Sequence, residues 1–545
     1  MNKFRTLVIF FVLTVITLGM LVGVHQVQRS LDSQVAEHKL RFTGEIRNAP
    51  PLVTFTTVAL GSFRGLVADL LWLRAEALKE KGNYFEMVQL ARWITDLQPT
   101  FSGATAYLAW NMAYNISVTC SSFADRWRWV NEGIRLIRDR ALYYNPEDPV
   151  IYKELAWIFG HKLGNILDDA NLYYKNQLAI QMNNIVGSAG NPDWTKLAAA
   201  PGSEKAFMKQ YPPEHPVWKA VAEAGFQNYE MLFKAFELSA PELPETLVKV
   251  LANNPELQEQ LALYFRSELL RQKLRLDPKR IVMLNKRFGT LDWRVPESQA
   301  IYWATLGAEK APGGHDISCD RIVSQCLYES FRAGRLMMVD EKNFESIIVV
   351  PNLSLVDSVF NTFTETQAVH DGADSKYSSF RSARINFMKE AVTILYNYGK
   401  FTKAAEYYKK LEAEDGKQKE GSLENFIMAQ WAEDVRDATV KKASEVISGL
   451  LFRSINYMIY NDHDAALANE RIARFIYKSY MSDMGNSERT KLPPFNEIKR
   501  NVVQQCLKMF PPVMAELLKA KIAAEQADAA VEKQFSTPAA KSVFR

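Results

Sequence analysis

Two polar clusters carry the side-chain types that bind divalent cations. Asp462, His463 and Asp464 are consecutive, and residues 315–320 combine histidine, aspartate and cysteine beside a Gly-Gly pair. Imidazole, thiolate and carboxylate groups are the usual zinc ligands. Neighbouring residues on a helix, however, point to different faces, so a turn between two helices explains the first cluster better than a metal site does. For the second cluster, a polar loop entering a helix, with an aspartate or serine as N-cap, is likewise the better explanation. We therefore expect no metal and no cofactor.

A third cluster mixes basic and aromatic residues, as binders of single-stranded nucleic acid do. Residues 126–129 read Arg-Trp-Arg-Trp. Bases would stack on the rings while arginine contacts phosphates, but two tryptophans two positions apart diverge on a helix, so one should belong to the core. The chain has 66 basic and 62 acidic side chains and a net charge of +4. It lacks the concentrated basic face of nucleic-acid binders, so we expect no nucleic-acid partner.

Recognised catalytic motifs are absent from the sequence. It contains no glycine-rich phosphate loop, dinucleotide fingerprint, His-Glu-x-x-His motif or nucleophile elbow. The seven histidines are dispersed, and no two are three or four residues apart. We therefore expect a protein that is not an enzyme, with an unfamiliar helical active site as the alternative.

The four cysteines are too few for a disulfide framework and lack zinc spacing. Cys319 and Cys326 are seven residues apart. In one continuous helix their Cα atoms would lie ~10 Å apart, beyond the reach of a disulfide. If Cys319 lies in the loop after the Gly-Gly pair, a bridge becomes feasible. Two free thiols and a disulfide are both open at this stage.

The elements that must position these side chains are indicated by a recurring helical pattern. The segment 108–112, Leu-Ala-Trp-Asn-Met, returns at 155–159 as Leu-Ala-Trp-Ile-Phe. Each copy begins nine residues after a proline, Pro99 or Pro146. Matching offsets around two prolines predict a repeated pair of helices, which favours a surface that holds other proteins over a catalytic pocket.

These residues resemble the tetratricopeptide repeat, in which antiparallel helix pairs stack into a superhelix. The interval of 47 residues from Pro99 to Pro146 exceeds the usual ~34. In addition, Lys310 replaces an expected aromatic residue, and the last block lacks its closing proline. The positions that carry the resemblance, and that we expect to pack between helices, are Gly82, Tyr84, Ala91, Pro99, Leu108, Ala109, Met112, Ala141, Pro146, Leu155, Ala156, Phe159, Trp303, Leu306, Gly307, Gly399, Phe401, Ala404 and Tyr408.

Tryptophans are concentrated in the first repeat block. Most should pack between helices, where each buried large side chain contributes ~2–3 kcal/mol. The resemblance implies a groove that receives an extended or helical polypeptide, and aromatic anchors dominate such interfaces. Candidates for this partner groove are Trp93, Trp110, Trp129 and Trp157.

The N-terminal segment is strongly apolar. Residues 7–24 contain no charge and follow Lys3 and Arg5. This length is near the lower limit for a transmembrane helix. Small residues suited to signal-peptide cleavage are absent, so we expect an uncleaved signal anchor. The positive-inside rule favours an exported body, which for a bacterium means a single-pass inner-membrane protein with its body in the periplasm.

The fold class expected from these patterns is all-α: helical-hairpin repeats forming an α-solenoid after one N-terminal transmembrane helix. The strand-like run 346–350 is too short and isolated to build a sheet. The expected divisions are an anchor at 1–24, a stalk at 25–60, a repeat block at 61–186, a divergent helical region with a long connection at 187–290, helix pairs at 291–345, an irregular connection at 346–379, a second repeat block at 380–480, and a C-terminal helix and tail at 481–545.

The resulting functional hypothesis is a membrane-tethered scaffold in the bacterial envelope. By analogy with tetratricopeptide proteins, it would bind a protein partner of export, assembly or envelope biogenesis. An envelope protein that binds glycans or nutrients is the alternative, although the lipidated cysteine of the starch-utilisation lipoproteins is missing after the apolar segment. Neither the partner's identity nor the oligomeric state follows from the sequence.

Overall fold

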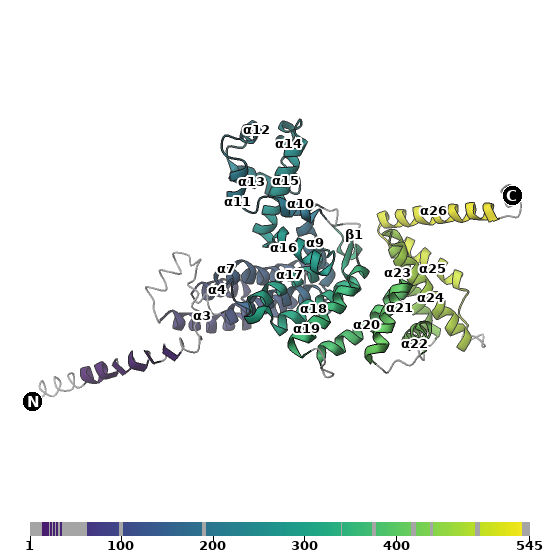
Figure 1. Cartoon of the computed structure of the whole chain (residues 1–545), viewed down its shortest axis with the longest axis horizontal. Helices are drawn as coiled ribbons and strands as arrows, with labels where there is room; N and C mark the ends of the chain where they lie inside the picture. Colours follow the sequence, from purple (N-terminus) through teal and green to yellow (C-terminus); the bar gives the residue numbers. More distant parts are fainter. Residues whose placement is uncertain are drawn as a thin grey trace, which may run out of the picture.

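A computed structural model shows a chain built from helices, as expected from its apolar periodicity (Figure 1). It describes residues 13–20, 22–23, 25–27, 29–30, 33–34, 63–97, 102–187, 192–338, 341–372, 378–415, 421–435, 440–484 and 491–536. The all-α prediction is confirmed.

The predicted anchor and stalk lie mostly outside the described residues. Residues 13–20 and several short stretches up to residue 34 are helical and exposed. Within the described part of the chain, no helix combines the length and the apolar character needed to cross a bilayer.

Two helical hairpins open the folded body. In the first, α3 (Phe63–Glu80) and α4 (Tyr84–Leu97) are joined at Gly82, whose φ of 74° suits glycine because it has no Cβ. The second pairs α5 (Ser102–Trp110) with α6 (Phe123–Arg135). A Cβ on Gly133 of α6 would lie 2.7 Å from the carbonyl oxygen of Ala109, so this glycine allows the two backbones to approach closely.

The third unit is completed by a helix distant in sequence. Helix α8 (Pro149–Trp157) packs against α17 (Pro296–Lys310). A Cβ on Gly307 of α17 would lie 2.9 Å from the Cβ of Tyr152 in α8. Helix α9 (Asn171–Val186) follows α8 but lies towards α6.

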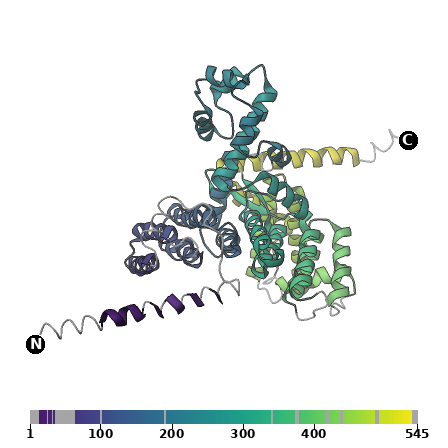
Figure 2. The same ribbon diagram turned by 60° about the vertical axis from the view of Figure 1, so that its left-hand side comes forward.

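The intervening region forms a helical arm that projects from the body in Figures 1 and 2. It contains helices where the sequence indicated a long connection. The helices between α9 and α17 are α10 (Trp194–Ala199), α11 (Glu204–Gln210), α12 (Val217–Glu223), α13 (Tyr229–Ser239), α14 (Glu245–Val250), α15 (Pro255–Leu269) and α16 (Pro278–Phe288). Aromatic packing holds the arm together, because the buried Phe207 ring stacks on Tyr264 with centroids 4.0 Å apart.

Helix α18 (Ile317–Ala333) pairs with α17 and leads into a small sheet. Strand β1 (Arg335–Met338) is antiparallel to β2 (Ile347–Val350), with Leu336 opposite Val349. The prediction that this run forms no sheet is wrong, because β1 supplies a partner that its sequence, directly after a helix, did not reveal. The irregular connection expected at 346–379 is also wrong in part, since it contains β2 and helix α19 (Val356–His370).

The last part of the larger core is a further hairpin. Helices α20 (Ser379–Asn397) and α21 (Phe401–Asp415) are joined at Gly399, with a φ of 72°, and α22 (Leu423–Val435) follows. One continuous apolar core extends from α3 to α22.

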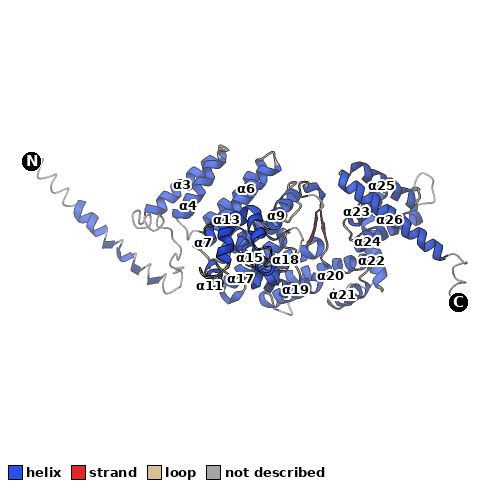
Figure 3. Cartoon of the chain, turned by 90° about the horizontal axis from the view of Figure 1, so that it is seen from above, coloured by secondary structure: helices blue, strands red, loops and turns tan. Residues whose placement is uncertain are grey.

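The C-terminal helices form a second apolar core. They lie together at the end of the molecule opposite α3, and α26 extends away from them (Figures 1 and 3). These helices are α23 (Val440–Ile459), α24 (His463–Met484), α25 (Phe495–Met509) and α26 (Pro512–Ser536).

Candidate functional site: an aromatic face and its adjoining cavity

The recurring sequence pattern corresponds to a repeated local structure. Helices α5 and α8 end at Trp110 and Trp157, and each continues as a π-helix of six residues. These π-helices, η1 (Asn111–Ile116) and η4 (Ile158–Leu163), begin at equivalent positions of the two copies. Because π-helical turns are uncommon and often occur at functional sites, their recurrence marks this region for examination.

Each π-helix places an aromatic ring against the preceding tryptophan. Tyr114 stacks on Trp110 with centroids 5.1 Å apart, and His161, its equivalent, stacks on Trp157 at 4.6 Å. The two pairs meet, since the Tyr114 hydroxyl lies 3.2 Å from His161 Nδ1. Burial, and secondarily the charge of Lys162, lowers the pKa of His161. A neutral imidazole is therefore favoured within the stack.

Two further rings extend this arrangement. Tyr107, one helical turn before Trp110, lies 5.1 Å from the ring of Trp72 in α3. Tyr107, Trp110 and Trp157 are each 37–39% exposed, so large apolar rings meet solvent here. We call this surface the aromatic face and define it by Trp72, Tyr107, Trp110, Tyr114, Trp157 and His161.

Only part of the predicted partner groove belongs to this face. Trp110 and Trp157 belong to it, but the placement of Trp129 in a groove is wrong. That ring is 7% exposed and packs between Tyr84 and Phe85. Trp93 is 49% exposed on α4, but it is not one of the rings that define the aromatic face.

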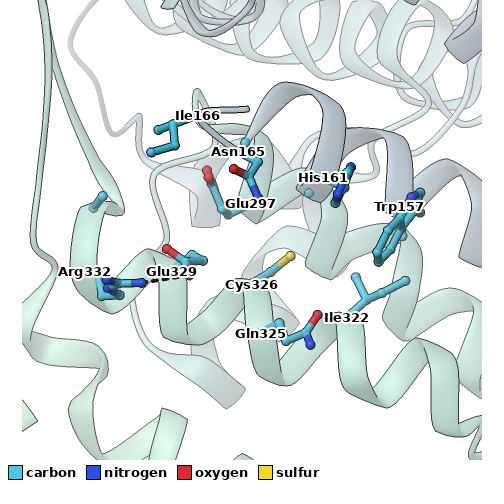
Figure 4. Close-up of a pocket in the computed structure, with 14 residues that line it drawn as sticks. Trp157, His161, Asn165, Ile166, Glu297, Ile322, Gln325, Cys326, Glu329 and Arg332 are labelled. Atoms are coloured by element: carbon cyan, nitrogen blue, oxygen red, sulfur yellow. Dashed lines mark hydrogen bonds and ion pairs between the residues drawn. The ribbon is translucent and has the colours of Figure 1, made fainter. Parts of the chain in front are cut away.

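A cavity of about 700 Å³ adjoins the face at its Trp157 end. In Figure 4, Trp157 and His161 project from one helix, while Ile322, Cys326 and Glu329 project from α18 on the other side. The two helices approach closely at Gly160, because a Cβ there would lie 2.8 Å from Cys326 Sγ.

A buried carboxylate lines this cavity. Glu297, in the first turn of α17, is only 7% exposed, and its Oε2 is a buried atom without a hydrogen-bond partner. Burial raises the pKa of Glu297, while the charge of Lys175 opposes that shift. Lys175 is itself buried and donates from Nζ to the carbonyl oxygen of Gly164 at 2.7 Å. Such a carboxylate is costly unless a ligand or a proton neutralises it.

The loop after η4 is fixed by a buried ionic cluster. Asp168 accepts hydrogen bonds from Lys162 Nζ, Arg126 Nη1 and the Tyr174 hydroxyl. Its side chain is 7% exposed and that of Lys162 is 5% exposed. Burial alone would raise the pKa of Asp168, but the hydrogen bonds from Lys162 and the Ala170 N–H lower it. A charged network therefore anchors the wall of the cavity.

Most residues expected to pack between helices are buried. Phe401 is instead 48% exposed and packs its ring edge-to-face against Tyr396, so the prediction that it lies in the interior is wrong. Gly82 and Gly399 occupy hairpin turns, and Pro99 lies outside the described residues. The buried members are Ala91, Leu108, Ala109, Met112, Ala141, Leu155, Ala156, Phe159, Trp303, Gly307, Ala404 and Tyr408, while Tyr84, Pro146 and Leu306 are partly buried.

The polar clusters singled out in the sequence have structural roles. Asp462 Oδ1 caps α24 by accepting from the Ala465 N–H, and its Oδ2 pairs with Arg335. Asp316 caps α18 by accepting from the Cys319 N–H. No group of three potential metal ligands occurs among the described residues.

The other two clusters are also explained by packing. Trp127 and Trp129 are both buried, whereas the sequence predicts that only one of them belongs to the core. Cys319 and Cys326 are free thiols on one continuous helix, which decides between the two states left open above.

Three site residues escaped the sequence reasoning. Tyr114 and His161 are equivalent under the 47-residue offset, so extending the comparison beyond residue 112 would have found them. Glu297 gives no such signal, because it reaches the cavity only through the packing of α17 on α8. The chain matches no protein-family model, and neither the curated proteins nor the solved structures contain a match.

Proposed function

We propose that this chain is a helical-repeat scaffold that holds a polypeptide partner on the aromatic face. The observation that carries the proposal is the joined pair of stacks, Trp110–Tyr114 and Trp157–His161, in which both tryptophans stay more than one third exposed although each stacks on a second ring. Covering one such ring contributes ~1.5–3 kcal/mol. Several together are sufficient to anchor a chain.

A polypeptide fits this surface because apolar and amide groups accompany the rings. Ile166 and Leu167, in the loop after η4, are 81% and 76% exposed. The half-buried Asn115, which follows Tyr114 in the chain and donates from Nδ2 to Oδ1 of the buried Asn111, supplies an amide group beside the stacked rings. Apolar contacts beside amide groups suit the alternating side chains and peptide bonds of a bound segment.

The tetratricopeptide resemblance supports the same role by analogy of fold. The glycine-jointed hairpins α3–α4 and α20–α21 agree with the helical-hairpin part of that resemblance. From the sequence of residues 1–24 alone, we further propose that an N-terminal anchor holds this scaffold in a bacterial envelope.

Site-specific photocrosslinking tests the proposal. A benzophenone amino acid at Tyr107 should give a discrete polypeptide adduct in the cells that naturally contain the protein. The adduct should disappear when Trp110 and Trp157 are both replaced by alanine. The same crosslinker at Leu238, which is 85% exposed on the distant arm, is the matched control. Identical adducts from both positions, or an adduct that survives the two alanine substitutions, would refute the proposal.

A glycan partner is the second candidate, because half-exposed tryptophans also stack on sugar rings. Quenching of tryptophan fluorescence by oligosaccharides, lost in the same double variant, would favour it over a polypeptide.

A further inference from the structure

The cavity beside the aromatic face contains an imbalance of charge. Glu297, Glu329 and Arg332 are charged residues that line it. Arg332 is already paired, since it lies 3.2 Å from Glu329 Oε1 and 2.8 Å from Glu390 Oε1. Lys175 donates to the Gly164 carbonyl, and although its charge acts on Glu297, it makes no hydrogen bond to Glu297 Oε2. Glu297 is thus left with a buried oxygen that has no hydrogen-bond donor.

The other residues that line the cavity are compatible with a bound cation. Trp157 lines the end of the cavity opposite Glu297 in Figure 4, where it can contact the apolar stem of a basic side chain. His161 does not oppose such an ion, because burial and Lys162 lower its pKa and favour its neutral form. The Cys326 thiol also stays uncharged, because burial raises its pKa.

We propose that this cavity binds an ammonium or guanidinium group, with Glu297 as its counter-ion and Trp157, at the other end of the cavity, beside the apolar stem that carries the group. The cation is a lysine or arginine side chain of the bound partner, an assignment that rests on the proposed function. A basic side chain beside the aromatic contacts would place its charge next to the unpaired Oε2 of Glu297. The cavity then selects for one basic residue in a polypeptide segment that binds the aromatic face through apolar contacts.

Titration of the purified full-length protein with two matched small probes tests the proposal. N-acetyl-lysine methylamide carries the ammonium group, and N-acetyl-norleucine methylamide replaces it by an apolar end. Lysine-probe binding should exceed norleucine-probe binding by about tenfold or more, because a charged hydrogen bond is made only by the former. Equal binding of the two probes by the wild-type protein would overturn the proposal without any mutant.

Glu297→Gln keeps the size of the side chain and removes its charge. Affinity for the lysine probe should fall by about tenfold, while affinity for the norleucine probe stays unchanged. Glu245→Gln, at a carboxylate 82% exposed on the arm, makes the same change in net charge and should have no effect. Because Glu297→Gln also removes the main charge that favours the ammonium form of the buried Lys175, the thermal midpoint of the variant is measured to show that it is folded when the probes are compared. Lysine-probe affinity that survives Glu297→Gln would overturn the assignment of the counter-ion.

The experiment separates this proposal from the proposed function. Selective binding of the lysine probe, together with failure of the crosslinking experiment, would establish the cation site but assign it to a small free amine. A crosslinked polypeptide whose binding is unaffected by Glu297→Gln would retain the scaffold and refute the cation site.

Discussion

Replacing Gly307 by alanine tests the contact that completes the third helical unit. Gly307 is buried in α17, where α8 and α18 both approach it. An added Cβ would lie 2.9 Å from the Cβ of Tyr152 and 2.8 Å from Cys319 Sγ. The sulfur can rotate away, but the Tyr152 Cβ is fixed to the backbone of α8. Helices α17 and α8 must therefore separate by several tenths of an ångström.

Two opposing effects set the magnitude. Alanine is a better helix former than glycine by up to ~1 kcal/mol. Overpacking a rigid contact of this kind costs ~1–3 kcal/mol, and sometimes more. Since the two atoms nearest to the added Cβ are closer than ordinary van der Waals distance, we expect the packing cost to exceed the helix-propensity gain. The net loss in the free energy of unfolding should be about 1–2 kcal/mol.

Gly449→Ala is the matched control, because it makes the same change in α23 where nothing lies within 4 Å of the added Cβ. It should stabilise the protein by up to ~1 kcal/mol. Ten of the 11 tryptophans lie in residues 72–303, so urea unfolding followed by tryptophan fluorescence reports on the larger core. Circular dichroism reports on both cores, including the C-terminal one that contains Gly449.

The double variant Gly307→Ala, Cys319→Ala adds a second measurement. It removes the sulfur contact but leaves the contact with Tyr152, so its coupling energy should recover only part of the loss. The reasoning fails if Gly307→Ala is as stable as the wild type. That result would mean that α17 does not cross α8 at Gly307.

Three further predictions concern other parts of the chain. Asp168→Asn should cost about 3 kcal/mol at neutral pH, because it leaves Lys162 buried without its counter-charge. Because the pKa of Asp168 is lowered in the folded state, its contribution to stability is complete above the unfolded-state pKa of about 4 and is lost as the pH falls through the lower folded-state pKa. The free energy of unfolding, measured with urea across acid pH, should therefore change less with pH in the variant than in the wild type. Alkylation of unfolded, unreduced protein should modify both Cys319 and Cys326, since their positions on one helix place them beyond disulfide reach; a product that lacks the two alkyl groups at these cysteines and is two hydrogens lighter than the corresponding free dithiol would contradict this. N-terminal sequencing of protein from native membranes should begin at residue 1, and a start after residue 20 would show that the segment 1–24 is cleaved.

The sequence predicted the features of this fold that depend on local pattern. The 47-residue repeat corresponds to the matching ends of α5 and α8. The repeat resemblance singled out Gly82 and Gly399, and both occupy the turns of helical hairpins instead of packing between helices. These signals are visible because each is contained in a few neighbouring residues.

Long-range packing explains what the sequence did not show. Helix α17 replaces the expected neighbour of α8, yet the arm α10–α16 separates the two in the chain. Glu297 and Glu329 look like ordinary surface acids until that packing brings both to one cavity. Likewise, Trp129 is as aromatic as Trp157, and only the packing of α4 on α6 decides that one is buried while the other is half-exposed.

The two copies of the repeat differ at one position, and this difference confines the charged cavity to the second copy. Position 113 of the first copy is alanine, while its equivalent in the second is Gly160, where α18 approaches so closely that a Cβ would meet Cys326 Sγ at 2.8 Å. The glycine therefore lets α18 close one side of the Trp157 stack, and Glu297 from α17 enters the resulting cavity. The Trp110 stack has no residue in that cavity. Apolar adhesion can then be supplied by both copies, whereas discrimination by charge is confined to the second, where the unpaired carboxylate lies.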